Sequence, residues 1–240
     1  MTKLLYLEDF SKLDCDASVL EVTEKDGKIA VILDQTILYP QGGGQAFDKG
    51  EIQSSSMSFR VDEVRMFDDV VWHFGSFANG IFQTGDMVQC VVDEVRRTLN
   101  SRIHSAGHVI DAVLEDMGLN WIPGRGYHFP EGPFVEYQGE LGNLDPGSFQ
   151  KDLELKCNEY IRKNVITRVE FMDQDTMERT FKFQPKALSE SQKARIIYFG
   201  DFGIPCGGTH VSNGLEIGNM TIKKVKQHHE IVRIAYDVAR

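Results

Sequence analysis

The chain has 240 residues, which is enough for one large domain or two small ones. No apolar run approaches the roughly 18 residues that a membrane span requires, and the N-terminal sequence shows no basic region leading into a hydrophobic one, so we expect a cytoplasmic protein. The net charge of -10 argues against a protein that coats nucleic acid, because such binding depends on Lys and Arg. Four scattered cysteines without paired spacing argue against a disulfide framework.

The charge is distributed unevenly along the chain. Residues 1–95 contain 17 acidic and 7 basic side chains, whereas residues 96–240 contain 19 of each. This asymmetry predicts two domains, at residues 1–94 and 95–240. It also leaves a nucleic-acid partner open for the neutral second domain.

The first domain is predicted to consist of short strands. Two apolar runs, 17–24 and 28–33, flank Lys25-Asp26-Gly27, and Asp-Gly between apolar runs is a strong hairpin signal. Further strands are predicted at 59–66, 70–74 and 87–92. Such strands must bury one face against each other, which favours a small β-barrel-like domain.

The pattern becomes helical near residue 94. Apolar residues recur at helical spacing over 94–117, and Gly118 supplies a C-terminal stop. The Gly/Pro-rich segment 122–133 cannot remain regular for long. The elements predicted after it are a strand at 134–138, a helix at 146–164 capped by Asp145 with Pro146 at its first position, a strand at 166–172, a short helix at 173–179, a strand at 194–199 and a final pair at 215–225 and 230–236. The second domain is therefore predicted to be α+β, with helices packed on an antiparallel sheet.

Two pairs of side chains predict a metal site. His104 and His108 lie four residues apart on the predicted helix, so both imidazoles project from one face. Cys206 and His210 are also four apart, and the two glycines between them allow a tight turn that brings both side chains together. This His₃Cys set suits Zn²⁺ better than it suits hard cations.

The same four residues leave two kinds of metal site open. A closed structural zinc site also has four protein ligands, but such sites are typically rich in cysteine and lie in short loops. A His-rich set that joins a long helix to a distant loop favours a catalytic site. Because no Glu follows His104, the helical metalloprotease pattern is absent, and hydrolysis of an activated ester is the better expectation.

Three motifs in order resemble the editing domain of alanyl-tRNA synthetase and its free-standing relatives, the AlaX trans-editing proteins. The first is the Gly-rich motif Leu-Asp-Gln-Thr-Ile-Leu-Tyr-Pro-Gln-Gly-Gly-Gly-Gln-Ala-Phe-Asp-Lys-Gly at residues 33–50. Arg-Arg at 96–97 followed by His-Ser-Ala-Gly-His at 104–108 resembles the first metal motif, and Cys-Gly-Gly-Thr-His-Val at 206–211 the second. Glu-Ile-Gly at 216–218 and Val-Arg-Ile at 232–234 continue the pattern. The synthetases usually carry Thr after the first His of the first metal motif and Thr before the second, so pocket details are expected to differ.

The resemblance implies a zinc-dependent hydrolase that deacylates tRNA(Ala) mischarged with serine or glycine. By position, Gln45 and Arg233 match residues that the family places near the substrate, and Thr36 is a candidate sensor of the seryl hydroxyl. Each has a simpler reading: Gln45 as an exposed residue beside a tight turn, Arg233 as half of a surface ion pair, and Thr36 as a structural residue of a strand.

The implied partner is the acceptor end of a mischarged tRNA, which the neutral second domain must bind. The predicted RNA contacts are Arg96, Arg97, Arg102, Arg125, Lys223, Lys224 and Lys226. Arg125 and His128 lie in a segment without a counterpart in the synthetase. His128 is read first as a loop residue, and a site-lining role for either residue is the alternative to be tested. Two other functions stay open: a deacylase of another mischarged tRNA or of a small aminoacyl ester, and a non-catalytic RNA-binding module stabilised by metal.

Overall fold

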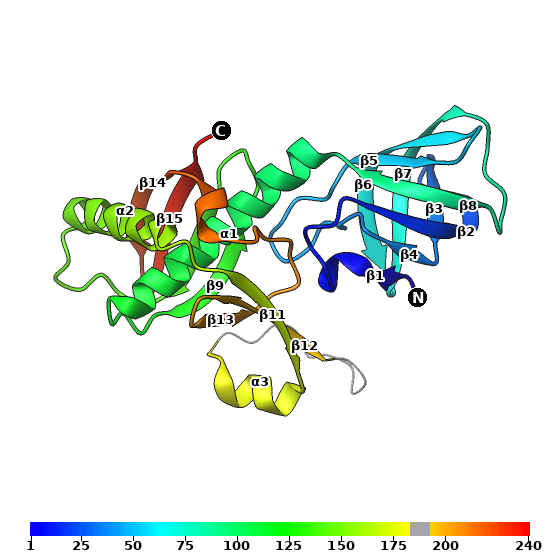
Figure 1. The fold of residues 1–240 in the computed structure, drawn as a ribbon. Helices are drawn as coiled ribbons and strands as arrows, with labels where there is room; N and C mark the ends of the chain where they lie inside the picture. Colours follow the sequence, from blue (N-terminus) through cyan, green and yellow to red (C-terminus); the bar gives the residue numbers. More distant parts are fainter. Residues whose placement is uncertain (183–192) are drawn as a thin grey trace. The chain divides into compact units, whose positions relative to one another are not determined.

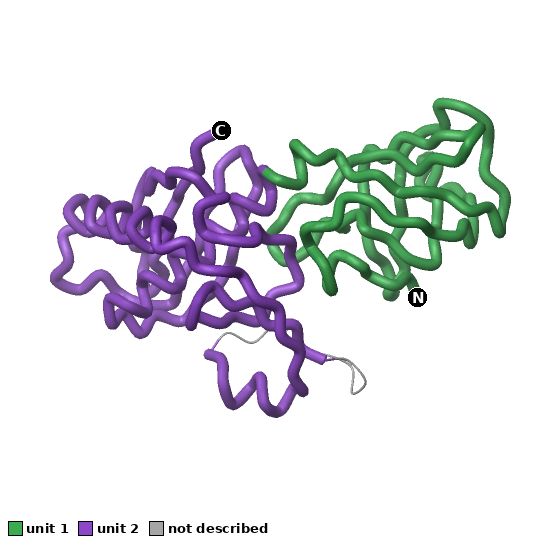
Figure 2. The backbone as a smooth tube through the Cα atoms, in the orientation of Figure 1, with its two compact units in different colours: residues 1–98 green, residues 99–240 purple. Residues whose placement is uncertain are grey.

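A computed structural model describes residues 1–182 and 193–240 of the chain. Its internal contacts divide it into two compact units, residues 1–98 and 99–240 (Figure 2). This boundary falls inside a helix, and the expected domain limits at 94 and 95 stay a prediction. Among the described residues, no helix has both the length and the apolar character needed to cross a membrane.

Unit 1 is built around a closed barrel of six antiparallel strands. In barrel order these strands are β2 (Asp14–Lys25), β3 (Lys28–Leu33), β7 (Val70–Asn79), β6 (Ser58–Phe67), β5 (Gly50–Gln53) and β8 (Met87–Val92) (Figure 1). The unit also contains a short parallel pair and one 3-10 turn: β1 (Lys3–Leu4), β4 (Gln35–Thr36) and η1 (Leu5–Leu7). The predicted hairpin is confirmed, because Asp26 and Gly27 connect β2 to β3 with φ of 53° and 74°.

Unit 2 combines helices with two antiparallel sheets. Its four-stranded sheet has the order β14 (Met220–His228), β15 (Ile231–Val238), β10 (Phe134–Gln138) and β9 (Ile122–Tyr127). Its three-stranded sheet has the order β11 (Thr167–Met172), β12 (Ala194–Phe199) and β13 (Phe202–Pro205). The helical elements are α1 (Glu94–Asp116), α2 (Pro146–Arg162), α3 (Gln174–Thr180) and η2 (Gly214–Ile217). The expected α+β class, with an N-terminal barrel, is confirmed.

One face of the four-stranded sheet forms the core of unit 2 with α1 and α2. Val232, Ile234 and Tyr236 of β15 are almost fully buried and share a hydrophobic cluster with Ile103 and Ile110 of α1. The intervening residues of β15 point to the other face, since successive side chains of a strand alternate. The sheet therefore has one buried face beside α1 and one face open to solvent.

Two parts of the second unit differ from the sequence-based expectation. The Gly/Pro-rich segment was expected to be irregular, but residues 122–127 form β9. This strand lies at the edge of the sheet, where Pro is tolerated because no neighbouring strand on the outer side requires a backbone N–H donor. The strand expected at 215–225 begins only at Met220, because residues 214–217 form η2. By contrast, the cap at Asp145 is confirmed, since its side chain accepts a hydrogen bond from Ser148 N at 2.8 Å.

Candidate metal centre

The first half of the centre comes from α1. His104 and His108 lie one turn apart on the helix, and their ring centroids are 5.0 Å apart. Both side chains are buried, with 1% and 6% of their surface exposed. The regular helix thus presents two imidazoles to one point inside unit 2.

The second half comes from the turn that follows β13. Arg195 of β12 is buried and donates hydrogen bonds to Cys206 O at 2.7 Å and to Gly208 O at 2.9 Å. Gly208 N donates to Cys206 Sγ at 3.4 Å, as expected for a thiolate held by the backbone. These bonds fix the Cys-Gly-Gly-Thr-His turn, so that His210 and Cys206 face the two helical histidines.

The two halves meet in a cluster with the dimensions of a metal site. One ligand atom from each of His104, His108, Cys206 and His210 lies within 4.8 Å of the other three. Cys206 Sγ is 3.5 Å from His104 Nε2. Zn–N bonds of about 2.0 Å and Zn–S bonds of about 2.3 Å in a tetrahedron imply a separation of about 3.5 Å between S and N. The donor set and this spacing fit a tetrahedral metal ion.

Neighbouring side chains orient the ligands. Asp111 Oδ2 is 2.9 Å from His108 Nδ1, and Asp111 Oδ1 accepts a hydrogen bond from Tyr137 at 2.5 Å. Ser105 Oγ is 3.3 Å from His210 Nδ1 and accepts from Val211 N at 3.1 Å. Both bonds engage Nδ1 and leave Nε2 as the ligand nitrogen, which is the usual arrangement around a metal-bound histidine. Sequence reasoning missed Asp111, although an acid three residues after a helical His is a usable signal.

The protonation states of the cluster also favour a cation. Burial lowers the pKa of His104 and His210 well below the usual histidine range, and the positive charges of neighbouring groups lower it further. Burial acts in the same direction on His108, but its hydrogen bonds to Asp111 and Cys206 outweigh burial and raise its pKa to about 10. Burial would raise the pKa of the Cys206 thiol, yet the hydrogen bond and charge of His108 lower it overall. His108 and Cys206 therefore stabilise each other's charged forms, and a cation bound between them would take the place of the His108 proton.

A fourth histidine packs against the cluster. The His128 ring stacks on His104, with ring centroids 4.4 Å apart. The Tyr236 hydroxyl donates a hydrogen bond to Ile103 O at 2.9 Å, so it accepts the hydrogen bond from His128 Nδ1–H at 2.6 Å. A Cβ atom at Gly107 would lie 2.6 Å from His128 Cε1. The glycine in His-Ser-Ala-Gly-His thus makes room for this ring, which packs directly against His104.

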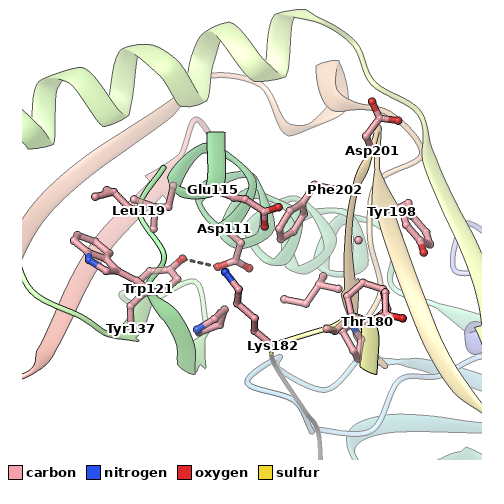
Figure 3. A pocket seen from close by; sticks show the side chains of 16 residues that line it. Asp111, Glu115, Leu119, Trp121, Tyr137, Thr180, Lys182, Tyr198, Asp201 and Phe202 are labelled. Carbon is pink, nitrogen blue, oxygen red and sulfur yellow. Dashed lines mark hydrogen bonds between the residues drawn. The ribbon is translucent and has the colours of Figure 1, made fainter. Parts of the chain in front are cut away.

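A cavity of about 300 Å³ is lined by Asp111, the carboxylate that contacts His108 (Figure 3). Its walls come from α1, β9, β10, β12, β13 and the chain at 180–182. Asp111, Glu115 and Lys182 supply charges, and Trp121 and Tyr198 supply aromatic surface. Asp111 thus lies in the wall of this cavity while its two oxygens contact His108 and Tyr137.

The predicted substrate residues lie in different parts of the molecule. Thr36 and Gln45 belong to unit 1, and both are fully buried there. Thr36 Oγ1 is 2.9 Å from His73 Nε2 and accepts from Leu38 N at 3.1 Å. Arg233 lies on the solvent face of the four-stranded sheet, opposite the face that packs on α1, and pairs with Glu136 at 2.7 Å. The structure does not bring Arg233 together with the four cluster residues.

The predicted RNA contacts fall into three groups by exposure. Arg97 is buried in unit 1, where its guanidinium group binds Asp48 and the carbonyl of Ile37 at 2.7 Å, so it has no surface that RNA could reach. Arg102 is half-buried and donates to Ile217 O at 2.8 Å, and Arg96 donates to Phe47 O at 2.8 Å. The remaining predicted contacts lie exposed in unit 2: Arg125, Lys223, Lys224 and Lys226.

Comparison with known proteins agrees with the motifs. Residues 8–96 match the family described as tRNA synthetases class II (A). Over 239 residues, or 98% of this chain, the sequence is 28% identical to the alanyl-tRNA editing protein AlaX-L of Pyrococcus horikoshii. The chain spans 58% of the length of that relative. The resemblance predicted from the motifs is confirmed: the sequence is AlaX-L-like.

Proposed function

Proceeding from an AlaX-L-like chain with a buried His₃Cys cluster, we propose that this protein is a zinc-dependent deacylase acting in trans on mischarged tRNA. Its substrate is tRNA(Ala) carrying serine or glycine, and the bond cleaved is the ester to the terminal nucleotide. The observation that carries the proposal is the convergence of three imidazoles and one cysteine sulfur from α1 and the turn after β13. The AlaX-L relative supplies the class of substrate.

The four side chains fit Zn²⁺, and a bound zinc ion would lower the pKa of a water molecule and polarise the ester carbonyl. The protein would hold the ion through His104, His108, Cys206 and His210. Asp111 fixes the tautomer of His108, and partners of this kind raise ligand basicity. Burial of the cluster excludes competing water, which strengthens every electrostatic interaction in the site.

Substrate contacts outside the cluster are also part of the proposal. Gln45 lies in the Gly-rich motif, but its side chain is fully buried in unit 1, so it is poorly suited to contact the aminoacyl end directly. Thr36 is less suited to sense a seryl hydroxyl, since its oxygen already has partners in His73 and Leu38. Arg125, Lys223, Lys224 and Lys226 are the exposed cations best placed to meet phosphates.

A deacylation panel tests the proposal directly. Zinc-loaded protein is incubated with Ser-tRNA(Ala), Gly-tRNA(Ala), correctly charged Ala-tRNA(Ala) and an unrelated mischarged tRNA, each with and without a chelator. We expect release of serine or glycine but not alanine, and loss of activity on chelation. Protein that contains zinc but releases no amino acid from the two mischarged tRNA(Ala) substrates would overturn the proposal.

Replacement of single cysteines separates catalysis from a purely structural metal. Cys206→Ala should abolish bound zinc and deacylation, whereas Cys90→Ala removes an equally small buried cysteine from the barrel and should leave both unchanged. A near-normal melting temperature for Cys206→Ala supports a catalytic metal. Unfolding of unit 2 in this variant, together with inactive wild-type protein, would support an RNA-binding module with a structural metal.

A further inference from the structure

The solvent face of the four-stranded sheet carries a column of stacked planar groups. Tyr127 lies between Phe129 and Phe134, with ring centroids 4.5 Å and 5.3 Å away and interplanar angles of 23° and 15°. Two guanidinium groups continue the column, since Arg233 is 4.2 Å and Arg125 5.6 Å from the Phe134 ring. We call these five residues the stacking column. Nucleotide bases stack on such aromatic rings and guanidinium planes.

Positive charge surrounds the column. Lys224 and Lys226 of β14 are exposed and pair in register with Ala235 and Arg233 of β15, which places them beside the column on the same face. Lys223 also reaches this face, where it lies 3.8 Å from Asp237. The basic residues of this face, including the two arginines of the column, therefore number five: Arg125, Lys223, Lys224, Lys226 and Arg233.

Few acids oppose these cations. Along β10 and β15 the acidic side chains on this face are Glu136, which pairs with Arg233, and Asp237. The face is thus positive within a chain whose net charge is -10. Local positive charge beside stacked rings is complementary to a polyanion that exposes its bases, and not to a neutral apolar protein surface.

We propose that this sheet face binds the unpaired 3′-terminal nucleotides of the RNA substrate, with bases stacking on the column and phosphates facing Lys224 and Lys226. The inference rests on the proposed function for the identity of the RNA. It adds a binding surface that uses Tyr127, Phe129 and Phe134.

The chain itself connects this surface to the metal centre. Tyr127 and Phe129 belong to the stacking column, while His128 between them lies on the buried side and stacks on His104. The end of the edge strand β9 therefore has the RNA surface on one side and the cluster on the other. An RNA strand on the column that crosses this edge arrives beside the candidate ligands.

Two variants separate stacking from charge. Binding of labelled tRNA(Ala), of a single-stranded RNA and of a duplex RNA is measured by fluorescence anisotropy over a range of salt concentrations. Phe134→Leu should weaken single-strand binding about tenfold with an unchanged salt slope, because the ring that holds Tyr127 and the two guanidinium groups in the column is lost. Lys224→Gln with Lys226→Gln should reduce the slope of log K against log salt by about 1.4, or about 0.7 for each phosphate contact.

A control pair removes the same charge elsewhere. Lys151→Gln with Arg162→Gln changes two exposed residues of α2 and should leave affinity and salt slope unchanged. If affinity and slope in the column and lysine variants equal those of wild type, or if the control pair lowers them as much, the inference is overturned. Equal binding of duplex and single-stranded RNA would also overturn it.

A small ester distinguishes failure of this inference from failure of the proposed function. The control pair Lys151→Gln with Arg162→Gln should hydrolyse a seryl ester of adenosine at the wild-type rate. In the column and lysine variants the loss of activity on tRNA should exceed the loss on this ester, because the small ester lacks the strand that the column binds. If wild-type protein cleaves neither mischarged tRNA nor the adenosine ester, the proposed deacylase function is refuted, while the binding measurements still test the RNA surface. If wild-type protein cleaves both substrates and the column variants cleave tRNA as fast as wild type, only the proposed RNA surface is refuted.

Discussion

His73 should make the barrel of unit 1 sensitive to acid. Its side chain is fully buried on β7, with Nδ1 2.9 Å from Val31 O and Nε2 2.9 Å from Thr36 Oγ1. A carbonyl only accepts hydrogen bonds, so Nδ1 carries the proton and the Thr36 hydroxyl donates to Nε2. Burial lowers the pKa of His73 from 6.5 to about 4.

The sign and size of the effect follow from this shift. Between pH 6.5 and pH 4 the unfolded chain binds a proton at His73 that the folded barrel does not, so the free energy of unfolding decreases as the pH falls. A shift of about 2.5 pKa units corresponds to about 3 kcal/mol, lost progressively across this range. Above pH 7 the contribution is fully present.

The barrel can be followed separately, because Trp72 lies in unit 1 and Trp121 in unit 2. In a Trp121→Phe background, denaturant unfolding is monitored by Trp72 fluorescence at pH 7.5 and pH 4 for the parent and for His73→Gln. Gln offers an amide donor and a carbonyl acceptor but does not titrate. The stability advantage of the parent over the variant should decrease by about 3 kcal/mol at the lower pH. An advantage that is the same at both pH values would refute this reasoning.

Three further predictions concern the centre and the barrel. Tyr137→Phe, which removes the donor to Asp111, should weaken zinc binding about tenfold in a chelator competition, whereas Tyr160→Phe, which removes another buried hydroxyl, should not. Asp48→Asn leaves a buried guanidinium group without its counterion and should cost about 3–5 kcal/mol in Trp72-monitored unfolding; a cost below 1 kcal/mol would contradict this. Gly107→Ala should destabilise unit 2 by about 1–3 kcal/mol in thermal unfolding, despite the better helix propensity of Ala, and a second His128→Ala change should restore most of the loss. Failure of that restoration would show that His128 is not the cause.

Local chemistry explains what could be predicted from the sequence. The Asp145 cap, the Asp26-Gly27 turn and the helix of α1 depend on residues close to one another in the chain, so their signals are complete in short windows. The four cluster residues could be named because a spacing of four with His or Cys is itself local. That the two pairs meet was an inference from their residue types.

The parts that were missed depend on contacts between distant segments. Nothing near Arg195 in the sequence shows that it binds the carbonyls of the Cys206 turn. From the sequence, two differences from the synthetase pattern looked independent. One is Gly107 in the first metal motif, where the synthetases usually carry Thr, and the other is His128 in a segment without a counterpart in the synthetase. The structure shows that the two differences are coupled, because the His128 ring occupies the space that a side chain at position 107 would need. Only the folded chain reveals such a pair.

The position of the ligands along the chain has a further consequence for the way unit 2 is held together. A cation bound by all four side chains would tie α1 to the turn after β13, and nearly 100 residues separate His108 from Cys206. In the chain-entropy description, a covalent cross-link closing a loop of this length stabilises the folded state by up to about 5 kcal/mol. The ion would therefore act as a reversible cross-link. If the backbone were cut between His108 and Cys206, the bound ion would still join the two fragments, and a chelator would remove that link.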